Sequence, residues 1–292
     1  MMAGLAQSPW LNRKLVSGAG ILAAILLFGL FGRFFWDTDL VFIGSAPVNL
    51  PPLGFENMRG QLSAAGHPLG TQSDGRDMLA LMIVGAPNTL LIGAIASVIG
   101  ITIGTVLGFS AGFIGGWVDA VIRVISDVMI TIPPLLVLIV FQTSLGEIGI
   151  FTMGLLLSTF MWQSPTRLIR AQVLAMREQG YVRMARLSGA STRDIMFREL
   201  MPNLLPYLFG SFIAIATTAI VTAVGLEVLG LGPQRVPTLG RVIYESIESA
   251  ALLKNMWWWW GIPTLMLATI FIGLLLINLG LDQVSNPRLR KV

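Results

Sequence analysis

The 292-residue chain has no cysteine, a single histidine and only three tyrosines, and charged residues make up 12% of it. The lack of cysteine excludes disulfide bonds, thiolate nucleophiles and zinc sites built on thiolates. One histidine cannot form a multi-histidine metal site, and no HExxH motif is present. The sequence therefore lacks the nucleophile and base pair expected of an intramembrane enzyme, and we expect no catalytic residue, metal site or cofactor site.

Charge is also scarce compared with soluble proteins, in which roughly 25% of residues are charged. Hydrophobic residues make up 54% of the chain, too many for a soluble fold of this length to bury. Uncharged runs of about 18 to 20 residues are long enough to cross a bilayer as helices. Six such runs occur, at residues 15–32, 78–118, 128–146, 148–166, 200–226 and 255–281. The sequence predicts an all-α membrane protein with six transmembrane helices.

The run 78–118 is long enough for either one crossing or two. Gly85, Pro87 and Asn88 are expected to break it early, which leaves about 25 residues from Thr89 for a single crossing. We therefore predict one span from this run.

Basic residues flank both ends of the apolar region and set the orientation. They are Arg13 and Lys14 before the first span, and Arg288, Arg290 and Lys291 after the last. Lys and Arg near span ends favour the cytoplasmic side, so both termini are predicted to be cytoplasmic and the number of spans even.

Two domains are expected. Residues 1–77 hold the first helix and an extracytoplasmic segment, and residues 78–292 form the transmembrane domain with a cytoplasmic loop near 167–203. The segment 37–77 is rich in turn formers and predicts an irregular cap, whereas 228–254 contains apolar residues at helical spacing. Asp74 and Asp77 fit the N-terminus of a helix, and Trp257 to Trp260 fit an aromatic belt at the outer membrane interface.

Four glycines repeat at intervals of four residues in the second span: Gly100, Gly104, Gly108 and Gly112. This small-xxx-small spacing lines up one helix face that another helix can approach closely. Tight packing within this chain is one interpretation, and contact with a partner subunit or a moving helix is the other.

Polar residues inside the predicted spans, and Glu227 at the outer end of the fifth span, are candidates for a translocation path. These are Gln142, Gln163, Ser211, Thr218, Thr222 and Glu227. Polar contacts between helices are an equally good explanation for the uncharged ones. A carboxylate in an apolar span is a functional candidate by default, although an interfacial position would give Glu227 an ordinary role. Pro133 and Pro134 should kink the third span.

The segment 167–203, called here the arginine-rich segment, carries seven arginines against Glu178, Asp194 and Glu199. Tyr181 to Ser188 predicts a short helix, Gly189 a sharp turn, and Ser191-x-x-Asp194 the cap of a second helix that runs to Leu200. Two short helices joined at a glycine would form a rigid knob that fits a groove in another protein. A solvated basic loop is the alternative.

This segment resembles the EAA loop of binding-protein-dependent ABC importer permeases, which couples the permease to its ATPase. The residues that carry the resemblance are Tyr181, Arg183, Met184, Ala185, Gly189, Ala190, Ser191, Glu199, Pro202 and Asn203. The sequence departs from the EAA triplet, because Arg183 stands at the Glu position and Met184 at the first Ala position.

Residues from about 15 to 290 are similar to the second-permease (C-type) branch of the dipeptide, oligopeptide and nickel family. The shared motifs are HPLGT (67–71), GRD (75–77), GGWVD (115–119), LMPN (200–203), GLEVLGLG (225–232) and NPRLR (286–290). Gln72 and Pro87 replace an Asp and an Arg that are usual in the family.

The resemblance implies a type I ABC importer permease fold in the cytoplasmic (inner) membrane of a bacterium or archaeon. It implies alternating access together with a homologous second permease subunit, two ATPase subunits or domains, and an extracytoplasmic solute-binding protein, all surrounded by membrane lipid. No nucleic acid is expected as a partner. The expected solute is an oligopeptide or dipeptide, with oligosaccharides, opines or nickel complexes as alternatives.

No GxxxxGK[ST] motif is present, so ATP and Mg are expected on the partner ATPases and this chain is expected to be a transporter subunit rather than an enzyme. A secondary transporter that works without ATP would call for internal inverted repeats, and no convincing repeat is seen.

Overall fold

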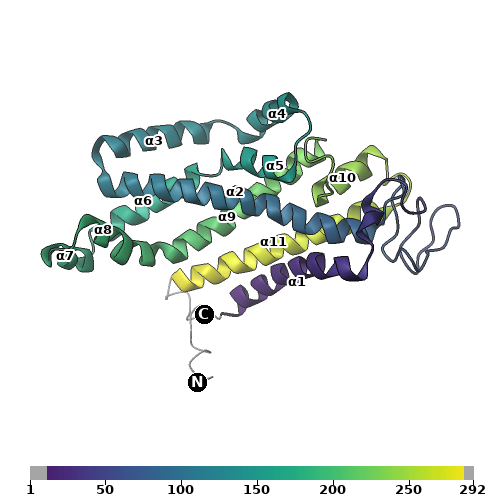
Figure 1. Cartoon of the computed structure of the whole chain (residues 1–292), viewed down its shortest axis with the longest axis horizontal. Helices are drawn as coiled ribbons and strands as arrows, with labels where there is room; N and C mark the ends of the chain where they lie inside the picture. Colours follow the sequence, from purple (N-terminus) through teal and green to yellow (C-terminus); the bar gives the residue numbers. More distant parts are fainter. Residues whose placement is uncertain (1–11, 286–292) are drawn as a thin grey trace, which may run out of the picture.

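The computed structural model describes residues 12–285, and within that range it is helical, with isolated β-bridges and no sheet. The long helices lie side by side along the longest axis of the molecule (Figure 1). The helices are α1 (Arg13–Phe35), η3 (Thr38–Val41), α2 (Met78–Ile114), α3 (Gly116–Thr131), α4 (Pro134–Leu145), α5 (Ile150–Ser158), α6 (Gln163–Arg177), α7 (Gly180–Leu187), α8 (Thr192–Asp194), the π-helical turn η4 (Ile195–Leu200), α9 (Met201–Val228), α10 (Leu239–Glu248) and α11 (Trp257–Ser285). The motif at 286–290 and the basic residues Arg288, Arg290 and Lys291 lie outside the described residues.

The two ends of the molecule differ in structure. α7 and α8 form one end, and the loop between α1 and α2 together with α10 lies at the other (Figure 1). The side-chain amide of Asn12 donates to the carbonyl of Gly280 (2.9 Å), so the start of α1 lies beside the last turns of α11.

Within residues 12–285, four helices are long and apolar enough to cross a membrane: α1, α2, the continuous stretch Thr192–Val228, and α11. α3 and α4 would count as a fifth crossing only if the pair is taken as one broken span, because they meet at an angle of 78°. The bend falls at Ile132 and Pro133, where the expected Pro133–Pro134 kink lies.

The run 148–166 does not form one continuous helix, in contrast to expectation. α5 has nine residues and ends at Ser158, and α6 starts at Gln163 after a turn. Gly100 on α2 packs against this turn, since a Cβ at Gly100 would lie 3.0 Å from the carbonyl oxygen of Met161. The turn therefore fits into space that the absent glycine side chain leaves.

The predicted break at Gly85, Pro87 and Asn88 is wrong, because α2 runs unbroken through them for 37 residues. The surroundings accommodate these residues, and the Pro87 ring packs against Gly29 of α1, where a Cβ would lie 2.0 Å from Pro87 Cγ. The Thr89 hydroxyl donates to the Gly85 carbonyl (3.0 Å), and the Asn88 amide donates to the Pro237 carbonyl (2.9 Å). The first turns of α2 lie among the residues of the 37–77 segment and α10.

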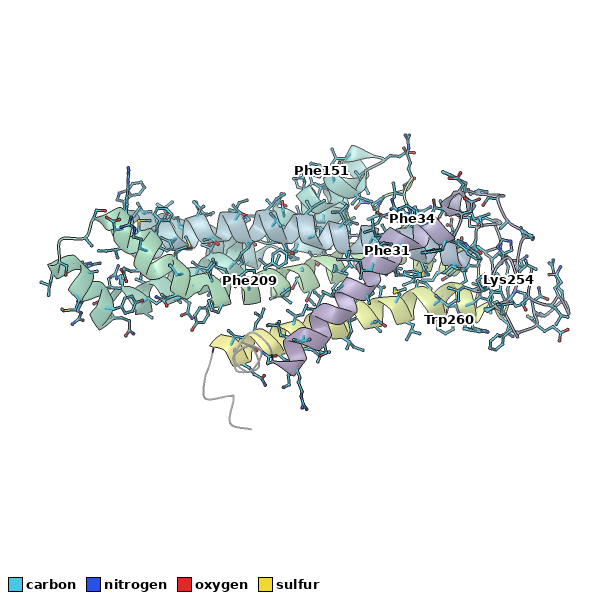
Figure 2. All side chains as sticks on the ribbon, turned by 60° about the horizontal axis from the view of Figure 1, so that its bottom comes forward. Phe31, Phe34, Phe151, Phe209, Lys254 and Trp260 are labelled. Carbon is cyan, nitrogen blue, oxygen red and sulfur yellow. The ribbon has the colours of Figure 1, made fainter. Side chains whose placement is uncertain are left out.

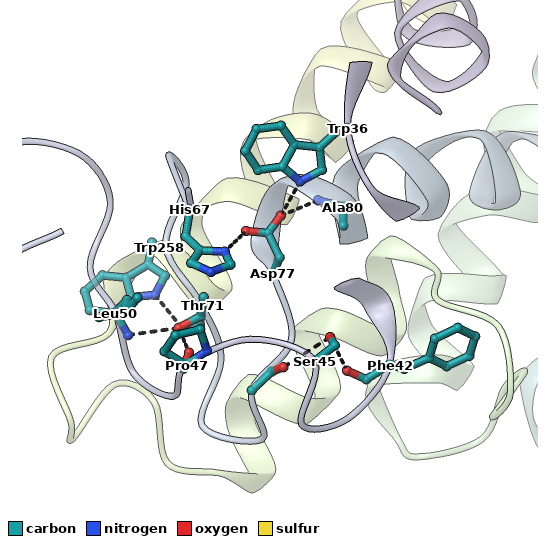
Figure 3. A network of polar contacts seen from close by, with 11 residues as sticks. Trp36, Phe42, Ser45, Pro47, Leu50, His67, Thr71, Asp77, Ala80 and Trp258 are labelled. Atoms are coloured by element: carbon teal, nitrogen blue, oxygen red, sulfur yellow. Dashed lines mark hydrogen bonds and ion pairs between the residues drawn. The ribbon is translucent and has the colours of Figure 1, made fainter. Parts of the chain in front are cut away.

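Asp77 caps the N-terminus of α2, as predicted. Its Oδ1 accepts hydrogen bonds from the Ala80 backbone (2.8 Å) and the Trp36 indole (2.9 Å), and its Oδ2 lies 2.8 Å from His67 Nδ1 (Figure 3). Asp74 takes no part in this cap and lies 2.9 Å from Arg76 instead. The single histidine thus helps to hold the irregular segment onto the helix.

The tryptophan run is only half interfacial. Trp257 and Trp260 are each 39% exposed, but Trp258 and Trp259 are buried. The Trp258 indole donates to the Thr71 carbonyl (3.1 Å) (Figure 3). The expectation of a four-residue aromatic belt is therefore wrong, because two of the four rings are buried and that of Trp258 holds the 37–77 segment in place.

Large apolar side chains cover the outside of the long helices. Figure 2 shows Phe31 and Phe34 projecting from α1, and both are more than half exposed. In water such a surface would be costly, at roughly 25 cal/mol for each Å² of apolar area. It fits contact with lipid or with another membrane subunit.

Candidate functional site

The arginine-rich segment begins on α6 and continues through α7 into the start of α9. Val182 on α7 is fully buried and packs in a cluster with Ile169, Val173, Ile195 and Leu200. One apolar side chain therefore attaches α7 to α6 and to η4, while most of the remaining α7 side chains stay exposed.

Gly189 ends α7 in a Schellman motif. Its N–H donates to the Arg186 carbonyl (3.1 Å), and the Ala190 N–H donates to the Ala185 carbonyl (3.0 Å). Gly189 has a φ of +79°, in the left-handed region that glycine adopts at the C′ position of this motif. The predicted glycine turn is present.

Ser191 caps the helix that follows the turn. The Asp194 N–H donates to Ser191 Oγ (3.2 Å), and that hydroxyl donates to the Asp194 carboxylate (2.6 Å). The second helix is not a separate short one, because α8 passes through the π-helical turn η4 directly into α9. Motion of this segment can therefore pass along α9 without an intervening loop.

Three residues that the resemblance singled out lie close together, although Tyr181 is about 20 residues before the other two in the sequence. The Tyr181 hydroxyl lies near the side chains of Asn203 and Glu199. The side chain of Asn203 donates to the backbone carbonyl of Glu199 (2.7 Å). Burial raises the pKa of the Tyr181 hydroxyl, and the negative charge of Glu199 adds to this effect.

The two-helix knob runs from Tyr181 to Asn203. The other residues that the resemblance singled out lie on its exposed side or inside its turns. Arg183, Met184, Ser191 and Pro202 are exposed, and Ala185 and Ala190 are partly buried. The side chain of Arg183 reaches Glu178 at 3.5 Å, a solvent-exposed pair that contributes little to stability.

Leu187 is a surface residue that the sequence reasoning did not single out. It is 83% exposed and lies next to the exposed Met184 at the tip of α7. The sequence signal that could have identified it is its position, because an apolar leucine stands between Arg186 and the Ser188-Gly189 turn. Exposed apolar side chains at the tip of a basic knob are typical of protein contacts.

A cavity of about 720 Å³ lies between α3, α4, α6, α9 and α11. Gln163, Ser211, Thr218 and Thr222 line it, so the structure brings together four of the six residues proposed for a translocation path. The Thr218 and Thr222 hydroxyls donate to carbonyls of their own helix, at 3.0 and 2.8 Å. Ser211 Oγ has no partner within the described residues. These hydroxyl oxygens remain available as acceptors.

Gln142 and Glu227 do not line this cavity. Gln142 is buried on α4, and Glu227 is buried near the end of α9. The Glu227 carboxylate lies at the N-terminus of α10, where a Cβ at Gly240 would come within 2.1 Å of Oε2. A helix N-terminus favours a negative group, but neither carboxylate oxygen of Glu227 has a hydrogen-bond partner within the described residues, so this position alone does not account for the buried acid. The part of Gln142 and Glu227 in a translocation path stays a prediction.

The glycine face of α2 packs against α6 of the same chain. A Cβ at Gly104 would lie 2.7 Å from Pro165, and one at Gly108 would lie 2.6 Å from the backbone oxygen of Thr166. Gly100 meets Met161 and Gly112 meets Val173 in the same way. α2 and α6 form the most extensive helix contact in the described structure.

Within residues 12–285 no cluster of three or more His, Asp or Glu side chains could hold a metal ion. The candidate functional features are the surface knob and the lined cavity, and helix α6 contributes to both.

Comparison with protein families matches residues 100–291 to the model described as binding-protein-dependent transport system inner membrane component. The chain belongs to this family. The matched part contains the knob, the helices that line the cavity and the glycine face of α2. Family membership and the apolar helices make it a multi-pass protein of the cytoplasmic membrane.

Curated relatives resemble the chain over most of its length. The oligopeptide transport system permease protein OppC of Lactococcus lactis subsp. lactis (strain IL1403) is 28% identical over 275 residues, covering 94% of this chain and 90% of the relative. OppC of Bacillus subtilis (strain 168) is 27% identical over 281 residues, covering 96% and 87%. OppC of Mycobacterium bovis is 30% identical over 228 residues, covering 77% of each chain.

Among solved structures, a chain of the MetNI methionine ABC transporter in an inward-facing conformation matches with a TM-score of 0.56. The match covers 71% of this chain and 96% of the other at 19% sequence identity. This similarity supports a common fold, that of a type I ABC importer permease.

Proposed function

We propose that this chain is one of two permease subunits of an ATP-driven, binding-protein-dependent importer whose solute is a peptide. The observation that carries the proposal is the continuity of α6, which lines the cavity with Gln163 and continues through a two-residue link into α7. The similarity to oligopeptide permeases over more than nine tenths of the chain supports the choice of solute.

The knob from Tyr181 to Asn203 is the proposed docking site for an ATPase subunit. Its exposed apolar tip at Met184 and Leu187 would enter a groove of the ATPase, and its anchor at Val182 would pass the motion to α6 and α9. ATP and Mg would be bound by the ATPase partners, with no cofactor in this chain. The irregular cap at 37–77 and α10 would face the extracytoplasmic binding protein.

A topology with both termini in the cytoplasm and six crossings is part of the proposal. The contact between Asn12 and Gly280 supports an even number, because it puts the start of α1 and the end of α11 on the same side. The two crossings beyond the four long helices would come from the bent pair α3–α4 and from α5 with the start of α6. Residues 78–292 would be the transmembrane domain, and residues 1–77 the added N-terminal region.

A homologous second permease subunit would close the open side of the cavity and complete the path for alternating access. Most polar groups that line the cavity are neutral, and among its described lining residues only Asp282 carries a charge. Neutral donors and acceptors suit the backbone amides of peptides of varied sequence. They would also suit sugar hydroxyls, so an oligosaccharide is the second candidate.

The test is solute uptake by the complex that contains this permease, its second permease, its ATPases and the associated binding protein, reconstituted in proteoliposomes. We expect ATP-dependent uptake of a labelled tripeptide to pentapeptide and no uptake of a labelled trisaccharide. Uptake of only the sugar, or of only a nickel complex, would overturn the peptide assignment. Uptake that persists without ATP would point to a secondary transporter.

A further inference from the structure

α3 is weakly attached to the rest of the described structure. Ser126 is the one buried residue on this 16-residue helix. Beyond the turn that joins it to α2, α3 packs against α6. α3 also supplies Met129 and Ile130 to the cavity wall, so its position affects the shape of the cavity.

One strong polar contact links α3 to α6. The guanidinium of Arg170 on α6 holds the carboxylate of Asp119 on α3 through two hydrogen bonds, one from Nε and one from Nη2 to Oδ2 (2.7 Å). Both side chains are partly buried, at 24% and 19% exposure. A bidentate, partly buried pair fixes orientation better than a single contact between exposed charges.

A second ion pair between the same two helices is longer and more exposed to solvent. Arg167 Nε lies 3.7 Å from Asp127 Oδ1, and both side chains are more than half exposed. Such a pair contributes little. It provides a matched control on the same two helices.

Arg170 is also fixed from its other side. Its backbone lies against the glycine face of α2, where Cβ atoms at Gly108 and Gly112 would come within 3.1 Å of its nitrogen and 3.0 Å of its oxygen. One turn before α7, Arg177 donates to the Gly112 carbonyl at the end of α2 (3.0 Å). α6 therefore holds the end of α2 as well as α3, close to the place where it continues into the knob.

The turn between α2 and α3 allows α3 to change direction. Gly115 and Gly116 both have positive φ values, of 73° and 59°, and no atom of the described residues would lie within 4 Å of a Cβ at either. A glycine pair in open space is permissive for backbone rotation. The orientation of α3 is thus set by its contact with α6 more than by the turn.

We propose that the Asp119–Arg170 pair is a positioning contact that makes α3, and the cavity wall on it, follow α6 when the knob moves. Arg170 and Asp119 would act through the helices and would not touch the solute. The inference rests on the proposed function, in which the knob receives motion from an ATPase. Without this contact, ATP-driven movement of α6 would not be transmitted to α3.

The experiment compares Asp119→Asn, Arg170→Asp, the charge exchange Asp119→Arg with Arg170→Asp, and the control Asp127→Asn in the reconstituted complex. The readout is the amount of peptide imported per ATP hydrolysed. We expect each single variant at the 119–170 pair to lower this ratio about fivefold or more, the lower end of typical coupling between sites. The charge exchange should recover most of the ratio, and Asp127→Asn should leave it unchanged.

A second readout follows the helix itself and needs no solute. Spin labels on cysteines at the exposed positions Val124 on α3 and Leu91 on α2 report the distance between these helices with and without ATP. We expect ATP to change this distance in the wild type and not in Asp119→Asn.

An unchanged import ratio in Asp119→Asn, or an ATP-dependent distance change that survives in it, would overturn the inference. Loss of assembly in the single variants without recovery in the charge exchange would also overturn it, since the pair would then be needed only for folding. Absence of peptide import by the wild-type complex would count against the proposed function instead, and the distance readout would still decide the role of the pair.

Discussion

Gly189 and Gly108 are needed for different physical reasons, although both are glycines at key points of the structure. No atom lies within 4 Å of a Cβ built at Gly189, and its φ of +79° is the only obstacle to a side chain. Gly108 is part of an ordinary helix, but a Cβ there would lie 2.6 Å from a backbone oxygen. The first position is selected by backbone conformation, and the second by packing.

The backbone reason at Gly189 can be tested with a pair of substitutions. Gly189→Val forces a β-branched residue into the left-handed region, which costs about 1 to 3 kcal/mol, whereas Gly189→Asn is tolerated there much better. We expect Val to weaken co-purification with the ATPase or to reduce transport per ATP, and Asn to stay close to the wild type. Equal behaviour of the two variants in both assays would contradict a role for the turn.

Glu227 shows how a residue can be identified as unusual without its role being evident from the sequence. A carboxylate in an apolar span predicts a functional site, and the residue is indeed buried. The N-terminus of α10 lies beside this carboxylate, and the loop that separates the two in the sequence has no recognisable pairing signal. The glycine at position 240 leaves room for the carboxylate, which explains why a side chain is absent there.

At the scale of elements, the contact between α2 and α6 is the central packing interface. The glycine spacing predicted a face for close approach, and the structure supplies α6 of the same chain as the element that meets it. If a larger side chain separated α2 from α6, lipid would provide no hydrophobic force to bring the helices together again. Close packing itself must therefore hold them in contact.

Replacing Gly108 with leucine should therefore separate α2 from α6. The side chain would meet backbone atoms, which cannot rotate away, and we expect loss of complex yield or of transport. The matched control is Gly20→Leu on α1, where no atom lies within 4 Å of a Cβ and leucine should be accommodated. The measurement is complex yield after affinity purification, followed by peptide uptake. Wild-type values for Gly108→Leu would show that this interface can open without consequence.

The sequence predicted helix positions well where apolar runs are uninterrupted, and less well where neighbours override local signals. α1, α9 and α11 follow their runs closely, whereas Pro87 lies inside a continuous α2, with its ring packed against Gly29 of α1 and Asn88 bonded to the Pro237 carbonyl. Conversely, the run 148–166 contains no charge and still breaks at 159–162, since Gly100 on another helix makes room for a turn.

The candidate site was predictable to a similar degree. Sequence order and turn chemistry were enough to place Gly189 and Ser191, because a Schellman turn and a helix cap are local. The contact of Tyr181 with Asn203 and that of Asp119 with Arg170 join residues distant in the sequence. Such contacts depend on how helices pack, and one sequence carries no direct signal for them.

At the scale of the whole molecule, the chain has a clear polarity. The knob at α7 and α8 lies at one end, and the segment 37–77, held by Asp77 and Trp258, lies at the other (Figure 1). The long helices between these ends present apolar side chains to the outside (Figure 2). Positive charge concentrates at the knob end, which fits the rule that basic loops stay in the cytoplasm.

This polarity leads to a labelling prediction in which any label on the purified chain comes from the introduced cysteine, because the wild-type chain has no cysteine. Met58→Cys lies in the 37–77 segment and Arg193→Cys lies in the knob, and both positions are exposed. In intact cells, a thiol reagent that cannot cross the membrane should label Met58→Cys and leave Arg193→Cys unlabelled. In inverted membrane vesicles the pattern should reverse, since the knob then faces the medium. Labelling of both positions from the same side would contradict the proposed orientation, and with it the assignment of the knob to a cytoplasmic ATPase.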